Sequence, residues 1–311
     1  MIKMIRKAKA GLLLSGFAGL MLATGSGSAF AQTCTIDNWK VAGVPASVGL
    51  SAANVGRPNQ SFAGAPFRRY GGPCGLRVPV DGTPRYLRDG SPANETSYNA
   101  RFYVFLNSAG NQNIRLFEGV NTSTTPAENA LEIWHLPVES KIVLTVETAT
   151  GPANLEITGI GSGWHSVEFA WASASDATVS LAVNVAIETA APPEFASATL
   201  NTSGQSIGEA RLGNVNGASA TNAFIDFDDF DSRRVSTPGR LCRGLTDESR
   251  DALSGDDAIE IYRESFGLAV AAGQPDYNED GAVTGDDAID LYRTVFGIAG
   301  GAPSPDCADN S

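Results

Sequence analysis

Short runs in which apolar and polar residues alternate fill the chain from about residue 34 to residue 234. Clear examples cover residues 100–106, 131–136, 141–146, 166–171 and 178–183. Gly, Asn, Ser and Pro separate these runs, and none of them keeps the 3.6-residue period of a helix. Because about two hundred residues are enough to bury a core between two sheets, the pattern predicts a mainly β protein with an antiparallel β-sandwich.

The period changes after residue 234. Pro238 and Gly239 interrupt the pattern, which predicts a linker over residues 235–241. Beyond it, residues 255–263 (GDDAIEIYR) return almost unchanged as residues 285–293 (GDDAIDLYR), and each copy is followed by a Phe-Gly pair. A duplicated segment of this length indicates a paired structural unit over residues 242–311.

Each copy of the repeat predicts a short helix. In the second copy the apolar residues recur at i, i+3, i+4, i+7 and i+8, which predicts a single apolar face that ends near Gly297. That face consists of Ala288, Leu291, Tyr292, Val295 and Phe296, and its counterpart in the first copy consists of Ala258, Ile261, Tyr262 and Phe266. Ser254 and Thr284 each stand three residues before an Asp, so we expect a capping box at both helix starts.

Oxygen-bearing residues precede the second helix at the spacing of a calcium-binding loop. Loop positions 1, 3, 5, 7, 9 and 12 are Asp276, Asn278, Asp280, Ala282 (through its carbonyl), Thr284 and Asp287. Gly281 at position 6 permits the sharp bend that such a loop needs. The sequence therefore predicts a Ca²⁺ site with these six ligands.

The loop before the first helix departs from this spacing. In the register set by Asp257, Arg250 stands at position 5 and would put a cation where the metal belongs. A loop shorter by one residue instead brings Asp247, Ser249 and Asp251 to the ligand positions. We expect one well-formed site and one degenerate site that uses these three residues and Asp257.

Two such loops, each followed by a helix of about ten residues and lacking the entering helix of an EF-hand, resemble the dockerin family over about residues 246–297. The resemblance implies a cohesin-like protein partner, in the context of polysaccharide degradation. It places the partner-binding positions at Gly255, Asp256, Tyr262, Arg263, Gly285, Asp286, Tyr292 and Arg293.

The alternating region has a resemblance of its own. Residues 98–103, 163–171, 210–213 and 224–234 follow one another as in laminin-G-like and concanavalin-A-like jelly rolls. The resemblance implies a two-sheet jelly roll over residues 32–234 that binds carbohydrate or another cell-surface ligand.

Catalytic residues are not expected in this region. Glycoside hydrolases of similar shape need two carboxylates, about 5–5.5 Å apart in retaining enzymes, and no Glu-x-Asp-x-Glu segment is present. The acidic run Asp226, Asp228, Asp229 and Asp231 is interpreted as an edge strand with solvated or ion-bound carboxylates. His135 and His165 are the only histidines that a serine triad could use as its base. We expect His165 to be a hydrogen-bonded packing residue.

The N-terminus has the features of a secretory signal peptide. Lys3, Arg6, Lys7 and Lys9 precede the apolar residues 11–23, and Ala29-Phe30-Ala31 ends the segment, so we expect cleavage after Ala31. The apolar run is shorter than the roughly twenty residues that span a bilayer, so no membrane span is expected. Removal of residues 1–31 leaves 18 of the 22 Lys and Arg against 34 Asp and Glu, a net charge of −16 that repels nucleic acid.

Four cysteines in an exported chain are expected to form disulfides, because that compartment is oxidising. Cys34, Cys74, Cys242 and Cys307 allow three pairings. Pairing 34 with 74 and 242 with 307 keeps each bridge within one region, and the second bridge would join the two ends of the repeat.

These observations together predict a secreted or periplasmic, calcium-binding and non-catalytic protein, with a β-sandwich that binds a polysaccharide or surface glycan and a dockerin-like module for assembly. Two alternatives remain at this point. One is a polysaccharide-acting glycoside hydrolase with an atypical carboxylate pair. The other is a structural component of a surface or matrix.

Overall fold

The computed structural model describes two separate regions of regular structure. The described residues are 55–56, 70, 75–90, 92–106, 110–185, 193–240, 244, 253–268, 275, 277 and 283–300. The predicted signal peptide and several predicted site residues lie outside them: Cys34, Cys74, Cys242, Cys307, Asp247, Ser249, Asp251, Asp276, Asn278, Asp280 and Ala282.

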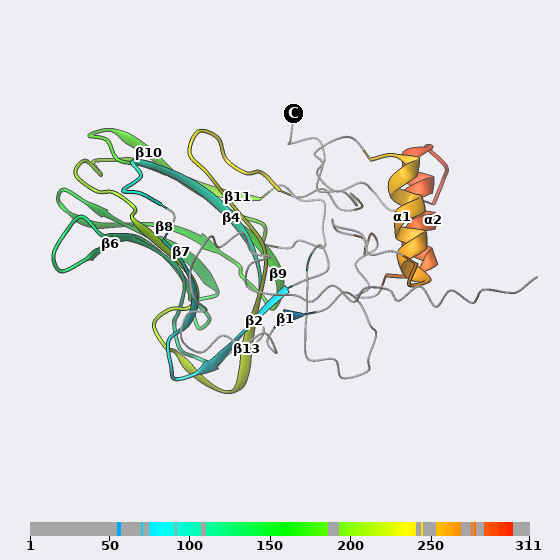
Figure 1. Ribbon diagram of the computed structural model, residues 1–311, viewed down its shortest axis with the longest axis horizontal. Helices are drawn as coiled ribbons and strands as arrows, with labels where there is room; N and C mark the ends of the chain where they lie inside the picture. Colours follow the sequence, from blue (N-terminus) through cyan, green and yellow to red (C-terminus); the bar gives the residue numbers. More distant parts are fainter. Residues whose placement is uncertain are drawn as a thin grey trace, which may run out of the picture. The chain divides into compact units, whose positions relative to one another are not determined.

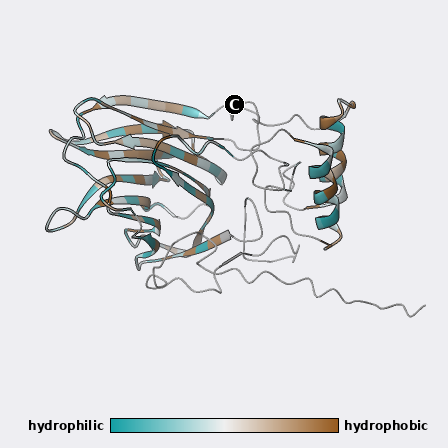
Figure 2. Cartoon of the chain, turned by 45° about the horizontal axis from the view of Figure 1, so that its top comes forward, coloured by the Kyte–Doolittle hydropathy of each residue, from teal (hydrophilic) through white to brown (hydrophobic). Residues whose placement is uncertain are grey.

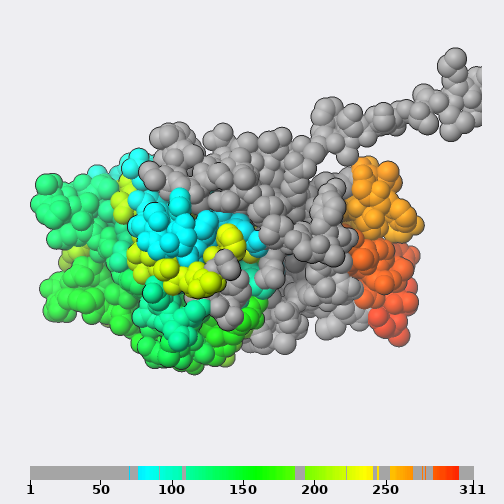
Figure 3. All heavy atoms as spheres, turned by 90° about the horizontal axis from the view of Figure 1, so that it is seen from below, coloured from blue at the N-terminus to red at the C-terminus, as the bar shows by residue number. Residues whose placement is uncertain are grey.

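The described residues between 55 and 233 contain two antiparallel sheets, which confirms the predicted mainly β sandwich (Figure 1). Sheet A has the order β1 (Val55–Gly56), β2 (Gly75–Asp81), β13 (Ser219–Arg233), β4 (Ser97–Leu106), β9 (Gly163–Ala172), β10 (Ala177–Val183) and β11 (Glu194–Leu200). Sheet B has the order β3 (Arg85–Asp89), β12 (Glu209–Asn214), β5 (Ile114–Asn121), β6 (Glu128–Leu136), β7 (Lys141–Thr148) and β8 (Gly151–Thr158). In Figure 3, β2 and β3 (cyan) lie beside their partners β13 and β12 (yellow to yellow-green).

The core between the sheets is aromatic at its centre. Phe102 of β4 packs 6.2 Å from Phe117 of β5, and Phe117 lies 5.1 Å from Phe169 of β9, measured between ring centroids. All three rings are buried, and each contributes on the order of 1.5–3 kcal/mol through removal of its apolar surface from water. Figure 2 shows hydrophobic bands alternating with hydrophilic ones along the strands.

The acidic run predicted as an edge strand is instead in the middle of sheet A, because β13 pairs with β2 on one side and β4 on the other. Asp226 is buried and accepts two hydrogen bonds from Arg77, at 2.6 Å from Nε and 2.7 Å from NH2. Asp228 is also buried and accepts a hydrogen bond from the backbone N–H of Tyr70. These carboxylates are therefore partnered within the fold, which corrects the interpretation of a solvated edge.

The predicted linker is fastened to the outer face of sheet A over its described part. Ser97 and Asn99 of β4 donate hydrogen bonds to the carbonyl oxygens of Arg234 and Ser236, at 2.7 and 3.3 Å. Arg101 donates to the carbonyl oxygen of Gly239 at 2.7 Å, while Glu168 accepts from the Gly239 N–H at 2.5 Å. Alternate residues of one strand thus hold the chain that leaves the sandwich.

The second region is a pair of eleven-residue helices, α1 (Gly255–Ser265) and α2 (Gly285–Val295), which pack against each other (Figure 1). Both predicted capping boxes are present, formed by Ser254 with Asp257 and by Thr284 with Asp287. Gly267 and Gly297 follow the helices with positive φ angles of 68° and 65°, as expected for residues just past a helix C-terminus.

The apolar face of each helix is only partly used in the pairing. The buried seam consists of Ala258, Ile261, Ala288 and Leu291, and Tyr277 is fully buried beside them. Tyr262, Phe266, Tyr292 and Phe296 were predicted to pack there and are exposed instead. The reason is the angle at which each side chain leaves the helix axis. Residues i, i+3 and i+7 form a narrow strip that faces the partner helix, whereas residues i+4 and i+8 are rotated roughly 40° and 80° from residue i, away from that strip.

No helix among the described residues is long and apolar enough to cross a membrane.

Candidate functional site

A compact group of charged and aromatic side chains covers the outer face of sheet B. It consists of Arg88, Arg115, Arg211, Glu118, Glu132 and Glu209, called here the Arg–Glu network, with Tyr86 and Trp134 beside it. These residues come from β3, β12, β5 and β6, which are neighbours in the sheet. Sequence reasoning missed this group.

A β-bulge brings two members of the network together. Arg115 pairs with Trp134 and Phe117 pairs with Ile133, so Leu116 is the extra residue in β5. Without the bulge, Arg115 and Glu118 would point to opposite faces, because side chains alternate along a strand. With it, both lie on the outer face while Phe117 reaches the core.

Glu118 is the centre of the network. Its carboxylate accepts hydrogen bonds from Arg115 and, at 2.8 Å, from NH1 of Arg211. Although it is on the outer face of a sheet, Glu118 is only 2% exposed. The two guanidinium groups therefore cover the carboxylate and neutralise it in place.

Trp134 joins the network through its indole N–H, which donates to Oε2 of Glu132 at 2.7 Å. The other carboxylate oxygen of Glu132 accepts from Asn129 at 2.5 Å and lies 3.3 Å from NH1 of Arg115. The Arg115 guanidinium carbon lies 4.7 Å from the Trp134 ring centroid, which is cation–π distance. Trp134 is partly exposed, so it combines a fixed ring orientation with access to solvent.

Arg211 and Glu209 continue the network towards β3. Nε of Arg211 donates to Glu209 at 2.6 Å, and Arg88 lies 3.6 Å from the same carboxylate. The guanidinium of Arg211 also lies 5.3 Å from the ring of Tyr86. Burial alone would lower the pKa of Arg211, but the hydrogen bond to Glu209 and the charges of Glu118 and Glu209 outweigh burial and raise it.

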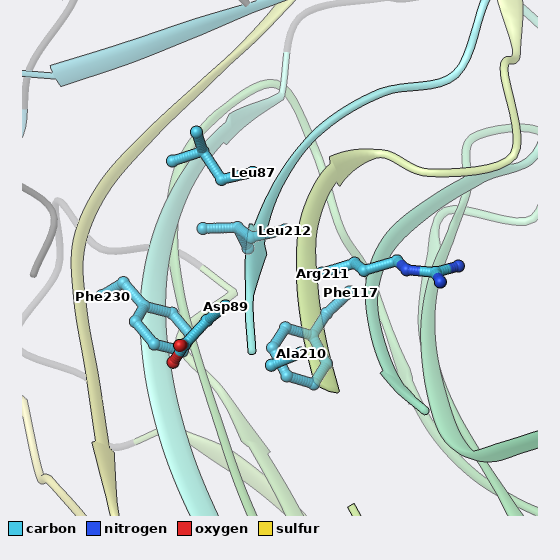
Figure 4. A pocket seen from close by; sticks show the side chains of 7 residues that line it. All are labelled: Leu87, Asp89, Phe117, Ala210, Arg211, Leu212 and Phe230. Carbon is cyan, nitrogen blue, oxygen red and sulfur yellow. The ribbon is translucent and has the colours of Figure 1, made fainter. Parts of the chain in front are cut away.

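An apolar opening of about 290 Å³, part of it open to solvent, lies on the inner side of the same strands. Its lining residues are Leu87, Asp89, Phe117, Ala210, Arg211, Leu212 and Phe230. Figure 4 shows the Arg211 guanidinium directed away from the Phe230 ring, and its hydrogen-bond acceptors are Glu209 and Glu118. The guanidinium therefore serves the outer network.

Both histidines lie inside the sandwich. His165 is held between two backbone carbonyl oxygens, with Nδ1 3.0 Å from that of Asn184 and Nε2 3.0 Å from that of Gly161, which confirms the expected packing role. Burial, with a smaller contribution from the charge of His165, lowers the pKa of His135 to about 4. Within the described residues, no three His, Cys, Asp or Glu side chains are grouped as a metal site.

The tryptophans divide between core and surface. Trp171 is buried in the core, and Trp164 packs against Tyr70 at 5.7 Å and Phe105 at 5.6 Å on the outer face of sheet A. Trp39 lies outside the described residues. Trp134 is thus the tryptophan that belongs to the face of sheet B.

Of the predicted calcium ligands, Thr284 and Asp287 are described. Asp287 is fully buried and accepts a hydrogen bond from the Thr284 N–H at 2.7 Å, so one carboxylate is fixed at the start of α2. Asp257 has the same place in α1 and accepts from the Ser254 N–H at 2.9 Å. Carboxylate, amide, carbonyl and hydroxyl oxygens, which make up the predicted donor set, fit a hard cation such as Ca²⁺.

The predicted partner-binding positions form two equivalent surfaces. Tyr262 and Tyr292 are 52% and 48% exposed and contact Phe266 and Phe296, with ring centroids 4.9 and 4.5 Å apart. Asp256, Arg263, Asp286 and Arg293 are exposed as well, whereas Gly255 and Gly285 are partly buried. Each helix thus presents an apolar pair beside charged groups.

No family model matches the chain, and no curated protein sequence matches it. Solved structures similar to it include an alginate lyase of Pseudomonas aeruginosa (12% identity, TM-score 0.39, 52% of this chain and 82% of that one). Others are an endo-β-1,4-glucuronan lyase of the fungus Trichoderma reesei (13%, 0.37, 61% and 92%) and a botulinum neurotoxin binding domain of serotype D/C (10%, 0.37, 52% and 41%). The chain spans about two fifths of the length of the botulinum neurotoxin chains that it matches. Similarities this remote do not indicate what the chain binds.

Proposed function

We propose that this chain is an exported, calcium-binding and non-catalytic protein that binds a glycan through the outer face of sheet B and attaches to a protein partner through its helical pair. The observation that supports glycan binding is the partly exposed Trp134 ring, held within the Arg–Glu network. Aromatic rings stack on the apolar faces of sugars, and fixed planar polar groups beside them meet pairs of hydroxyls.

A binding role accounts for the carboxylates of this face better than hydrolysis does. Glu118 and Glu132 are directly opposite each other on β5 and β6, which is the kind of pair that a glycosidase would need. However, Glu118 is buried under Arg115 and Arg211, and both oxygens of Glu132 are engaged. A hydrolase needs one carboxyl group that delivers a proton to the substrate, and a carboxylate covered by two guanidinium groups is poorly placed for that step.

The two exposed aromatic pairs support the attachment role. Tyr262 with Phe266, and Tyr292 with Phe296, leave apolar surface in water that a partner would cover. The resemblance of the repeat to dockerins suggests a cohesin-like partner. Calcium that binds only the folded helical pair would stabilise it by about 2.7 kcal/mol at a hundredfold excess over the dissociation constant.

A glycan array probed with the mature chain in calcium tests the glycan-binding part. We expect binding that Trp134→Ala weakens about tenfold, without release of reducing sugar from any bound polymer. Release of reducing sugar that depends on Glu118 or Glu132 would establish the hydrolase instead.

Scanning calorimetry with and without EDTA tests the calcium-binding part. We expect chelation to lower the melting transition of the helical pair and to leave the transition of the sandwich unchanged. A thermogram that is identical in both conditions contradicts it.

A further inference from the structure

The Arg–Glu network is balanced in charge. Three arginines face three glutamates, and each guanidinium lies within 3.6 Å of a carboxylate oxygen. Arg115 bridges Glu118 and Glu132, and Arg211 bridges Glu118 and Glu209. The network itself is therefore neutral within a chain whose net charge is −12.

An acidic polysaccharide would have to disturb these pairs. A uronate carboxylate that takes the guanidinium of Arg115 or Arg211 competes with Glu118, which is 2% exposed and would lose its partner. Leaving a buried charge without its partner is strongly unfavourable. A polyanion would also be repelled by the negative charge of the rest of the chain.

A neutral sugar needs no such exchange. Its apolar face can stack on the Trp134 ring, whose orientation is fixed by the indole hydrogen bond to Glu132. Neighbouring sugar hydroxyls can donate hydrogen bonds to a carboxylate and accept hydrogen bonds from a guanidinium. Both groups are planar, and each can form several hydrogen bonds at once, so an ion pair leaves further lone pairs and N–H groups for a sugar.

We infer that the outer face of sheet B is a binding site for a neutral polysaccharide, with Trp134 as the stacking platform and the Arg–Glu network as the hydroxyl partner, and that it rejects uronate polymers. The inference rests on the proposed glycan binding and specifies its ligand class. Since no net charge is exchanged, affinity changes less than twofold between low and high salt, whereas a polyanion site weakens steeply.

The test uses the full mature chain in calcium and two sets of soluble polymers. The neutral probes are laminarin, galactomannan and xyloglucan, and the acidic probes are alginate and polyglucuronate. Binding is measured by calorimetry or affinity electrophoresis at 50 and 500 mM NaCl. We expect at least one neutral polymer to bind at both salt concentrations and neither acidic polymer to bind.

Three variants locate the site. Trp134→Ala is expected to weaken binding about tenfold, which corresponds to about 1.4 kcal/mol and is within the range of an aromatic stacking contact. Trp134→Phe keeps a ring but loses the indole N–H to Glu132, and it is expected to weaken binding less. Phe195→Ala is the matched control, because Phe195 is 65% exposed on β11 of the other sheet and its loss should leave binding unchanged. Thermal melts of all variants establish that they are folded.

The outcomes are distinguishable. Salt-sensitive binding of alginate or polyglucuronate that Trp134→Ala abolishes overturns the inference and leaves the proposed glycan binding intact. Binding of a neutral polymer that is unaffected by both Trp134 variants overturns the location. Binding of none of the five polymers contradicts the inference and the proposed glycan binding together.

Discussion

Replacing Glu118 by Gln tests whether the Arg–Glu network is a single coupled unit. The carboxylate of Glu118 accepts hydrogen bonds from Arg115 and Arg211, and the residue is only 2% exposed. Breaking a fully buried ion pair costs about 3–5 kcal/mol. The side chains of Arg115 and Arg211 are 21% and 28% exposed, so water can resolvate part of their charge. We therefore expect Glu118→Gln to lower the free energy of unfolding by about 2–3 kcal/mol.

The matched control is Glu156→Gln on β8 of the same sheet. Glu156 pairs with Lys141 at 2.9 Å, but its side chain is 44% exposed, and exposed ion pairs contribute little to stability because water screens them. Urea denaturation followed by fluorescence gives both free energies. The double variant Glu118→Gln/Arg211→Gln should be destabilised by less than the sum of the two single changes, since each removes the same contact. A loss below about 0.5 kcal/mol for Glu118→Gln, or strictly additive effects, would refute the coupled network on which the glycan site depends.

Three further predictions follow from the same structure. Burial lowers the pKa of His135 to about 4 in the folded chain, whereas the same side chain has a pKa of about 6.5 when the chain is unfolded. The unfolded chain therefore binds the proton first, and the free energy of unfolding should fall as the pH drops from about 6.5 to about 4. Between pH 7 and 4.5 the wild type should lose about 2–3 kcal/mol more than His135→Phe by urea denaturation, and parallel pH curves would exclude this account. Arg101→Met should speed trypsin cleavage after Arg234 and Arg240, because Arg101 holds the Gly239 carbonyl, whereas the half-exposed Arg88→Met should not. Asp287→Asn should remove most of the calcium-dependent rise in the melting temperature of the helical pair by circular dichroism, and Asp257→Asn much less; equal losses would mean two sites of similar quality.

The sequence predicted those parts of the fold that depend on local periodicity and helix-end chemistry. Alternation in residues 100–106 and 141–146 indicated β4 and β7, and the Ser-x-x-Asp and Thr-x-x-Asp spacings identified both helix starts. These features depend on residues a few positions apart, so they are visible in a single segment.

The misplaced features depend on pairing between distant segments. Leu116 is one extra residue in β5, and nothing in its own segment shows that it shifts Arg115 and Glu118 to one face. Asp226 was interpreted as solvated because its partner Arg77 is 149 positions away in the sequence. Tyr262 and Tyr292 belong to an apolar face by period alone, but the seam between two short helices is narrower than that face. The predicted disulfides and most of the predicted calcium ligands lie outside the described residues and stay predictions.

The two outer faces of the sandwich use their polar residues differently. On sheet A, Asn99, Arg101 and Glu168 bind the backbone of the segment that leaves the sandwich, so their hydrogen-bonding groups are occupied by this chain. On sheet B, the charged groups of the outer face bond mainly to one another and leave Trp134 partly exposed among them. A network that is neutral and internally paired can accept a neutral ligand without losing any of its own ion pairs. This difference supports our proposal that glycan binding is on sheet B, whereas the polar residues of sheet A hold the segment that leaves the sandwich.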